Sequence, residues 1–304
     1  MNIFEYAKMK KMLGGGGAEP IPLNVSQNGI YTAPQGQAYS PVNVAVKDIE
    51  LIEGDYFEEG IAKFVIWLPE GRTTVGIRFR QPSWSLATVD WGDGATNTQE
   101  YNGNGQNIRH TYESGGYHIV KLIPAQSNDS IQLGRSAGYE PMFYRVAGNY
   151  NPHSVVVKAY IGGSNFRMGH SSFYMQRFMQ TFVGVDNMYF TGEYAFSGCC
   201  SLRTVTIPNG TTMISGYQFR ECDSLSKIVF PPSVISIRTE AFAGCPSILT
   251  YDFSQHESVP TLEKSNAFSD LSSSGGKILV PSALYDEWIA ATNWSALASN
   301  IVAV

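Results

Sequence analysis

Residues 194–208 read YAFSGCCSLRTVTIP, residues 217–231 read YQFRECDSLSKIVFP, and residues 240–253 read EAFAGCPSILTYDF. The three segments start 23 residues apart, and five columns keep one kind of residue. The clearest columns are Phe196, Phe219 and Phe242; Cys199, Cys222 and Cys245; and Leu202, Leu225 and Ile248. A period in the twenties with alternating apolar residues predicts a solenoid, in which short strands bury their apolar faces against neighbouring turns.

The repeat continues in altered form on both sides. Upstream, Phe173 lies one period before Phe196, and residues 155–161 read as the strand of a first, divergent unit. Downstream, Phe268 restarts the motif, and residues 277–281 supply a further strand. Altered terminal units are typical of solenoids, whose ends must be capped.

The last segment, residues 282–304, is predicted to be that cap. Ser282 is expected to cap a short helix in which Leu284, Trp288 and Ala291 share one face. The residues from Trp294 onward would then close the end of the stack.

The pattern A-F-x-x-C-x-x-L-x-x-V-x-I-P resembles the BspA-like, or Treponema-type, leucine-rich repeat, and the resemblance covers about a third of the chain. It implies a leucine-rich-repeat β-solenoid over residues 151–281. That family includes proteins implicated in attachment to host matrix, so the resemblance also implies a binding role.

All four cysteines lie in the repeat, and three share one column. A ladder of small buried side chains is the favoured interpretation. Disulfides between neighbouring turns and a metal site are the alternatives, but identical positions with no histidine in step do not converge on one ion. We therefore expect neither a metal nor a cofactor.

The first 17 residues are predicted to be an anchoring arm. Gly14 to Gly17 form a flexible linker after a candidate short helix, whose apolar residues are Phe4, Tyr6, Met9 and Leu13. A helix of this length is marginal alone in water, so it is either a frayed terminus or a segment that orders against another subunit. It lacks the apolar centre of a secretory signal.

Residues 18–48 are predicted to form a small β module. Asn28-Gly29 is a turn signal, and Val42, Val44 and Val46 alternate as in a strand. The pattern N-G-x-Y-x-A-x-x-x-x-A-Y-x-P-V-x-V-x-V resembles a short module of tail- and baseplate-associated proteins of bacteriophages and prophages. The resemblance implies a virion protein whose arm contacts other tail subunits.

Residues 49–150 are predicted to form one β-sandwich. Residues 62–68 and 73–80 read as a hairpin, in which Val75, Ile77 and Phe79 face inward.

Two motifs in this segment, W-G-D-G at 91–94 and H-T-Y at 110–112, resemble a polycystic-kidney-disease-type (PKD-type) immunoglobulin-like domain. The resemblance implies a spacer or a binding module found beside carbohydrate-binding domains. Lys121 stands where that family has an apolar residue, so a shifted or bulged strand is expected there.

Composition excludes several classes of protein. The net charge is −5, and no Lys/Arg cluster follows Lys8, Lys10 and Lys11, which argues against a nucleic-acid partner. The longest unbroken apolar run, residues 64–68, is far too short to span a membrane. Abundant Gly, Ser, Thr, Asn and Tyr suit an extended β protein with many turns.

No residue pattern indicates catalysis. Asp90 and Asp93 invite a calcium or acid–base interpretation, but Gly92-Asp93-Gly94 reads as a tight turn in which Asp93 bonds its own loop. His110 and His118 are interpreted as partly buried aromatics, and His153, His170 and His256 have no acidic partner at a recognisable spacing. Nucleophile-elbow, zincin and P-loop motifs are absent. We therefore expect that the protein is not an enzyme.

Tyrosines crowd the entry to the repeat, and they are Tyr144, Tyr150, Tyr160, Tyr174, Tyr189 and Tyr194. They are either the core of a capping unit, which is the favoured interpretation, or a binding platform that offers large contact area at low entropic cost.

Three functions are weighed on these grounds. The first is a phage or prophage tail or baseplate protein that presents the solenoid to a protein or glycan of the host surface. Its arm would seed a trimer, although the sequence equally permits a monomer. The second is a bacterial cell-surface adhesin of the BspA-like kind. The third and weakest is a non-catalytic carbohydrate-binding protein, which rests on the sandwich and the tyrosines.

Overall fold

The computed structural model describes residues 58–68, 71, 73–81, 86–100, 106–127, 129–134, 141–145 and 154–304. Contacts divide the chain into two units, residues 1–56 and 57–304, and every described residue belongs to the second. The predicted arm with Phe4, Tyr6, Met9 and Leu13, the module at 18–48, and Tyr150 lie outside the described residues. The described part is mainly β, as predicted.

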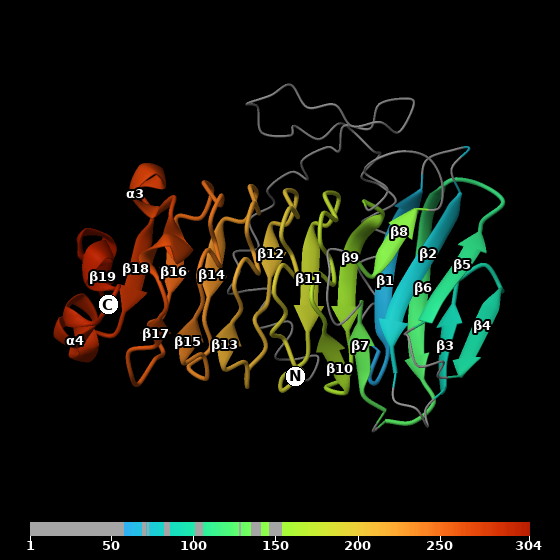
Figure 1. Ribbon diagram of the computed structural model, residues 1–304, viewed down its shortest axis with the longest axis horizontal. Helices are drawn as coiled ribbons and strands as arrows, with labels where there is room; N and C mark the ends of the chain where they lie inside the picture. The colour runs from blue at the N-terminus through green and yellow to red at the C-terminus, as the bar shows by residue number, and fades with distance from the viewer. Residues whose placement is uncertain are drawn as a thin grey trace. The chain divides into compact units, whose positions relative to one another are not determined.

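The first sheet joins the predicted sandwich segment to the predicted repeat (Figure 1). It has seven strands in the order β12-β11-β9-β1-β6-β3-β4. Their bounds are β1 Ala62–Leu68, β3 Leu86–Asp90, β4 Thr96–Glu100, β6 Gly116–Pro124, β9 Val156–Ile161, β11 Thr181–Gly184 and β12 Thr204–Val205. Strand β9 pairs antiparallel with β1 and parallel with β11, so the pairing changes direction there.

The second sheet packs against the first. It has the order β10-β7-β2-β5, with β8 also paired to β2. Its strands are β2 Thr74–Arg80, β5 Gln106–Thr111, β7 Ile131–Leu133, β8 Phe143–Arg145 and β10 Phe166–Met168. The rings of Phe64 on β1 and Phe143 on β8 lie 4.9 Å apart, so side chains of both sheets meet in one core.

The predicted hairpin of residues 62–68 and 73–80 is wrong. Strands β1 and β2 lie in different sheets, so the chain crosses from one sheet to the other between them. Every residue of β1 except Trp67 is buried, as in a central strand covered on both faces, and β9 occupies the edge at which a hairpin partner would pair. Val75, Ile77 and Phe79 do face the core, as predicted.

Lys121 causes no irregularity in β6, contrary to the prediction. Strand β6 pairs with β1 in unbroken register, with Val120 and Leu122 buried on the inner face. Lys121 points to the opposite face, where its Nζ lies 3.5 Å from the Glu58 carboxylate. The two-residue alternation of a strand therefore accommodates a charged residue at this position.

The repeat stack, residues 154–304, supplies β9 to β12 to the first two sheets and forms two further sheets of its own. On one side, β14 (Lys227–Val229), β16 (Thr250–Asp252), β18 (Lys277–Val280) and β19 (Ile301–Ala303) follow β12 in sequence and pair with one another in parallel. On the other side, β13 (Met213–Ile214), β15 (Ser236–Ile237) and β17 (Thr261–Leu262) pair in parallel. Each full turn thus contributes a short strand to each side (Figure 1).

A column of stacked phenylalanine rings runs through the interior. Phe196 and Phe219 have ring centroids 5.2 Å apart, and Phe219 and Phe242 have centroids 5.3 Å apart, with interplanar angles of 0° and 3°. Phe173 extends the column at one end and Phe268 at the other. All five rings are buried, so each turn covers the ring of the turn before it.

A tight turn carries each of the first four rings, Phe173, Phe196, Phe219 and Phe242, whereas Phe268 ends the 3-10 helix η1 (Ser265–Phe268). The tight turn begins at a residue with left-handed backbone, and these residues lie one period apart at Ser171, Tyr194, Tyr217 and Glu240. Such a conformation costs a non-glycine residue on the order of 1 kcal/mol. The turn allows the Phe196 amide to donate to the Gln218 carbonyl at 2.8 Å, and each such hydrogen bond ties one turn to the next.

Buried Gln176 links the repeat stack to the two-sheet segment, which is the described part of residues 58–145. Its Oε1 accepts hydrogen bonds from the Val155 and Val156 amides, each at 3.0 Å. Its Nε2 donates to the Phe143 carbonyl on β8 at 3.0 Å. One side chain therefore connects the tight turn to strands of both sheets.

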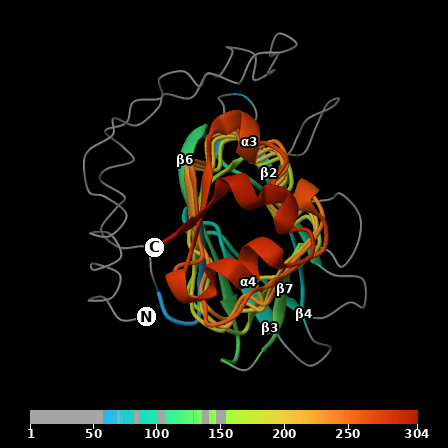
Figure 2. The ribbon, with the colours of Figure 1, turned by 90° about the vertical axis from the view of Figure 1, so that its left-hand side faces the viewer.

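Helical segments cross the C-terminal end of the stack (Figure 2). They are η1 Ser265–Phe268, α3 Leu271–Ser274, η2 Ser282–Leu284, α4 Tyr285–Ala290 and η3 Ser295–Asn300. Trp288 and Trp294 are fully buried against Phe253, with ring centroids 5.4 and 5.6 Å from it. The predicted Ser282 cap is wrong, because the Ser282 hydroxyl donates instead to the Val304 carbonyl at 3.0 Å and helps to hold the chain end.

Replacing Phe219 with alanine should destabilise the protein by about 3–5 kcal/mol, because the ring is fully buried between two other rings. The shift of the urea unfolding midpoint measures this loss. Val229→Ala on the exposed side of β14 is the control and should change the free energy of unfolding by about 0.5 kcal/mol or less. Equal midpoints for the two variants would contradict the role of the ring column.

Candidate binding surface

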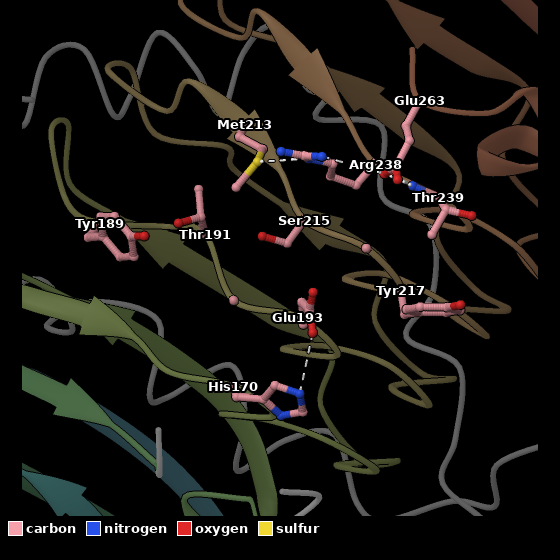
Figure 3. A pocket seen from close by; sticks show the side chains of 12 residues that line it. His170, Tyr189, Thr191, Glu193, Met213, Ser215, Tyr217, Arg238, Thr239 and Glu263 are labelled. Carbon is pink, nitrogen blue, oxygen red and sulfur yellow. Dashed lines mark hydrogen bonds and ion pairs between the residues drawn. The ribbon is translucent and has the colours of Figure 1, made fainter. Parts of the chain in front are cut away.

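A pocket of about 470 Å³ opens on the β13 and β15 side of the repeat stack. Figure 3 shows Tyr189 at one end, Tyr217 at the other, Met213 and Arg238 along one wall, and Glu193 and His170 along the opposite wall. Thr191, Gly192, Ser215, Gly216, Thr239 and Glu263 complete the lining. The lining comes from consecutive turns, so side chains far apart in sequence meet because the turns stack in register.

Two ion pairs occupy the walls of the pocket. His170 Nε2 lies 3.6 Å from a Glu193 carboxylate oxygen, and Arg238 Nη1 lies 3.8 Å from a Glu263 carboxylate oxygen. Both distances exceed that of a direct hydrogen bond. The expectation that His170 lacks an acidic partner is wrong, because Glu193 follows it by one period and the turns place them side by side.

Two tyrosine rings frame the pocket. Tyr189 is 54% exposed, and the Arg167 guanidinium lies 5.8 Å from its ring centroid. Tyr217 stacks on Tyr194, with centroids 4.6 Å apart and an interplanar angle of 2°. Backbone ladders hold the turns that carry these rings, so the surface is preorganised.

A group of acidic residues lies on neighbouring turns outside the pocket. Burial, together with the charges of Glu221 and Asp270, raises the pKa of Asp223 to about 6, although the charge of Arg177 opposes the shift. The Asp270 carboxylate accepts hydrogen bonds from the Gly244 and Cys245 amides, which explains its position beside the tight turn.

The tyrosines considered as a binding platform differ in how deeply the structure buries them. Tyr144 and Tyr160 are only 5% and 6% exposed, so they are core residues and offer no face to a ligand. Tyr144 packs under the Arg78 guanidinium, 3.7 Å from the ring centroid. Tyr174 is half-buried and lies outside the pocket lining, and Tyr150 is outside the described residues.

The W-G-D-G and H-T-Y motifs meet in one cluster. Asp93 accepts hydrogen bonds from the Ala95 amide at 3.0 Å and pairs with His110 Nε2 at 2.7 Å. The His110 ring stacks on buried Trp91, and the Tyr112 hydroxyl donates to the Trp91 carbonyl at 2.9 Å. Asp90 accepts from the Gly92 amide at 2.9 Å. Asp93 thus bonds its own loop, as the tight-turn interpretation expects, and Asp90 does so as well.

The cysteine column is a ladder of buried thiols. Each Sγ donates to the carbonyl of the phenylalanine one turn earlier: Cys199 to Phe173, Cys222 to Phe196 and Cys245 to Phe219, at 3.1, 3.3 and 3.0 Å. All four cysteines are free. Burial raises the pKa of Cys199 and of Cys222, and it raises the pKa of half-buried Cys200 to about 11, so these thiols stay protonated near neutral pH.

Two negative findings concern only the described part of the chain. There, His, Cys, Asp and Glu side chains do not form a group of three or more that could hold a metal ion. Nor is any helix there long and apolar enough to cross a bilayer.

The repeat agrees with a known family model. The model described as BspA type leucine rich repeat region matches residues 160–283 in six copies. The match supports the resemblance drawn from the Phe, Cys and Leu columns and covers every residue that lines the pocket. No curated protein matches the chain.

Sequence reasoning missed most of the pocket. Tyr189 is one of the tyrosines singled out at the entry to the repeat, but Glu193, Arg238 and Glu263 do not belong to the conspicuous columns, because those columns mark the interior. The 23-residue period is the signal that identifies Glu193: His170, Glu193, Gly216 and Thr239 form a column on the outer side of the tight turn.

Replacing Asp223 with asparagine should stabilise the protein near neutral pH by about 1 kcal/mol, a figure reduced for its partial exposure. The raised pKa means that the folded state binds the proton more tightly than the unfolded chain. Stability from this group is therefore present below pH of about 4 and is lost as the pH rises through about 6. Urea unfolding at both ends of this window should show the gain near pH 7 and no gain near pH 4.

Asp252→Asn is the matched control with the opposite sign. Although burial opposes the effect, hydrogen bonds from Ser254 and Lys227 lower the pKa of Asp252, so its ionised form stabilises the fold. This variant should lose stability near neutral pH. A gain for both variants at pH of about 7 would show that general charge reduction, and not the Asp223 environment, is responsible.

Proposed function

We propose that this chain is a non-catalytic attachment protein that binds its target through the pocket side of the repeat stack. The observation that carries the proposal is the pocket itself, in which two tyrosines, two carboxylates and a guanidinium gather on rigid, hydrogen-bonded turns. Tyrosine and arginine are enriched where proteins bind partners. The BspA-type repeat match supports a binding role for the same turns.

The two-sheet segment acts in this proposal as a spacer built like a PKD-type immunoglobulin-like domain. The Trp91, Asp93, His110 and Tyr112 cluster supports it, because the two quoted motifs meet there. Strand β9 pairs with both β1 and β11, so a spacer joined in this way transmits force directly into the repeat stack.

Such an attachment protein could be carried by a bacterial cell or by a phage particle, and different observations support these two carriers. The BspA-type match favours an adhesin on a bacterial cell surface, which would bind animal matrix or cells. The glycine-linked arm and the pattern in residues 23–46 favour a phage or prophage tail or baseplate, which would bind bacterial cells. Immunoblots of induced prophage particles and of cell envelopes distinguish the two carriers.

The attachment test uses the labelled full chain on bacterial cells and on matrix-coated surfaces. We expect saturable binding to one of these targets and a loss of at least about tenfold in affinity for the combined variant Tyr189→Ala, Tyr217→Ala and Arg238→Ala. The matched control, Val229→Ala with Leu249→Ala, removes exposed apolar side chains that do not line the pocket and should bind as the parent does. Equal loss in both variants, or no binding to either target, would refute the proposal.

Oligomeric state tests the anchoring role of the arm. If residues 1–17 seed a trimer, light scattering should give three times the chain mass for the full chain and a single chain mass for a chain that begins at Ala18. If both chains have the mass of a single chain, the arm does not mediate self-assembly. In that case the only role left for the arm in this proposal is binding to a different protein.

A further inference from the structure

The floor of the pocket is open because one turn carries glycine where its neighbours carry side chains. Gly216 occupies the column of Glu193 and Thr239, and all three residues line the pocket. A Cβ at Gly216 would meet the Thr239 carbonyl oxygen at 3.5 Å, which is ordinary van der Waals contact. Neither packing nor a left-handed backbone requires glycine at this position. Gly192 differs, since a Cβ there would lie 2.4 Å from the Gly169 carbonyl oxygen.

Glycine loses more backbone conformational entropy on folding than other residues do. A glycine that the fold does not require therefore indicates that the space a side chain would fill is needed for another purpose. Any side chain at 216 would enter the pocket between Glu193 and Thr239. A side chain at this position would take up part of the pocket, whose volume of about 470 Å³ falls within the range of about 300–1,000 Å³ found for small-molecule sites.

The lining selects the chemical class of ligand. Hydroxyl groups come from Tyr189, Thr191, Ser215, Tyr217 and Thr239, and they both donate and accept hydrogen bonds. The Thr191 hydroxyl is shielded from water and has no hydrogen-bond partner among the described residues, so Thr191 lines the pocket without offering its hydroxyl to a ligand.

The charges in the pocket argue for a neutral ligand. Glu193 and Glu263 each face a basic side chain, His170 and Arg238, at distances too long for direct hydrogen bonds. Arg238 Nε also donates to Met213 Sδ, and a Glu263 carboxylate oxygen accepts from the Thr239 amide, so a ligand would use only the remaining donors and acceptors of this pair. The two glutamates are opposed by Arg238 and His170, so the pocket has no large surplus of one sign to attract an ion. Met213 and the exposed Tyr189 ring supply the apolar contact area.

We propose that the pocket binds a neutral saccharide of about two sugar units, whose hydroxyls bond the carboxylate, guanidinium and hydroxyl groups and whose C–H face packs on the exposed Tyr189 ring. Hydroxyl-rich rings with apolar faces match this mixture of donors, acceptors and aromatic rings. This inference rests on the proposed function and names the class of target that the pocket side recognises.

The test is saturation-transfer NMR on the full chain with four neutral disaccharides: lactose, maltose, cellobiose and N,N'-diacetylchitobiose. We expect transfer to the ring protons of at least one of them. Gly216→Leu fills the pocket and should weaken that binding at least about tenfold without lowering the melting temperature. Val229→Leu, which enlarges an exposed side chain of β14 outside the pocket, is the matched control and should bind as the parent does.

Three results would overturn the inference. They are no transfer to any of the four disaccharides, unchanged binding by the Gly216→Leu variant, and transfer only to sialyllactose or to an oligolysine peptide, which are included as charged probes. If the labelled chain attaches to cells through the pocket side but binds no neutral disaccharide, the proposed function stands and the saccharide class is wrong. If a disaccharide binds but the chain attaches to no surface, the attachment role fails instead.

Discussion

Every turn of this protein has to place its phenylalanine ring over the ring of the turn before it. The rings of Phe196, Phe219 and Phe242 are nearly parallel and about 5 Å apart, close to the spacing of hydrogen-bonded strands. The same distance between neighbouring turns therefore suits both the stacking of the rings and the pairing of the backbone strands. An inserted residue in a turn would misalign the two, so the 23-residue period is kept strictly through the middle of the stack and relaxed only near its ends.

The same requirement explains how the stack ends. A turn without a neighbour would expose its phenylalanine and its unpaired backbone to water. At the N-terminal end, β9 pairs with β1 and Gln176 bonds strands of both sheets, so the two-sheet segment covers the first turn. At the C-terminal end, Trp288 and Trp294 pack on Phe253 beneath the helical segments. The described core is one continuous hydrophobic cluster for this reason.

Positions whose side chains face away from the ring column do not have to keep the same residue from turn to turn. The column of His170, Glu193, Gly216 and Thr239 changes residue at every turn, although its backbone geometry repeats. Such a column can alter charge and size from turn to turn without loss of core packing. The pocket arises where this column, the tyrosines and the Arg238–Glu263 pair converge, so stability and recognition are carried by different faces of the same turns.

The sequence by itself determined the period, the buried columns and the mainly β character, because these depend on residues that recur at a constant local spacing. The family match to residues 160–283 agrees with that part of the interpretation. The sequence also indicated the turn at Asp93, because there the carboxylate accepts a hydrogen bond from the Ala95 amide only two residues away.

Only the tertiary structure decided which segments pair across the chain. The separation of β1 and β2 into two sheets, the junction at β9 and the pairing of His170 with Glu193 depend on how whole turns and sheets stack. Periodicity says that two residues share a column, but the distance between their side chains depends on the rise and twist of the stack. For that reason the pocket could be located only once the turns were placed in space.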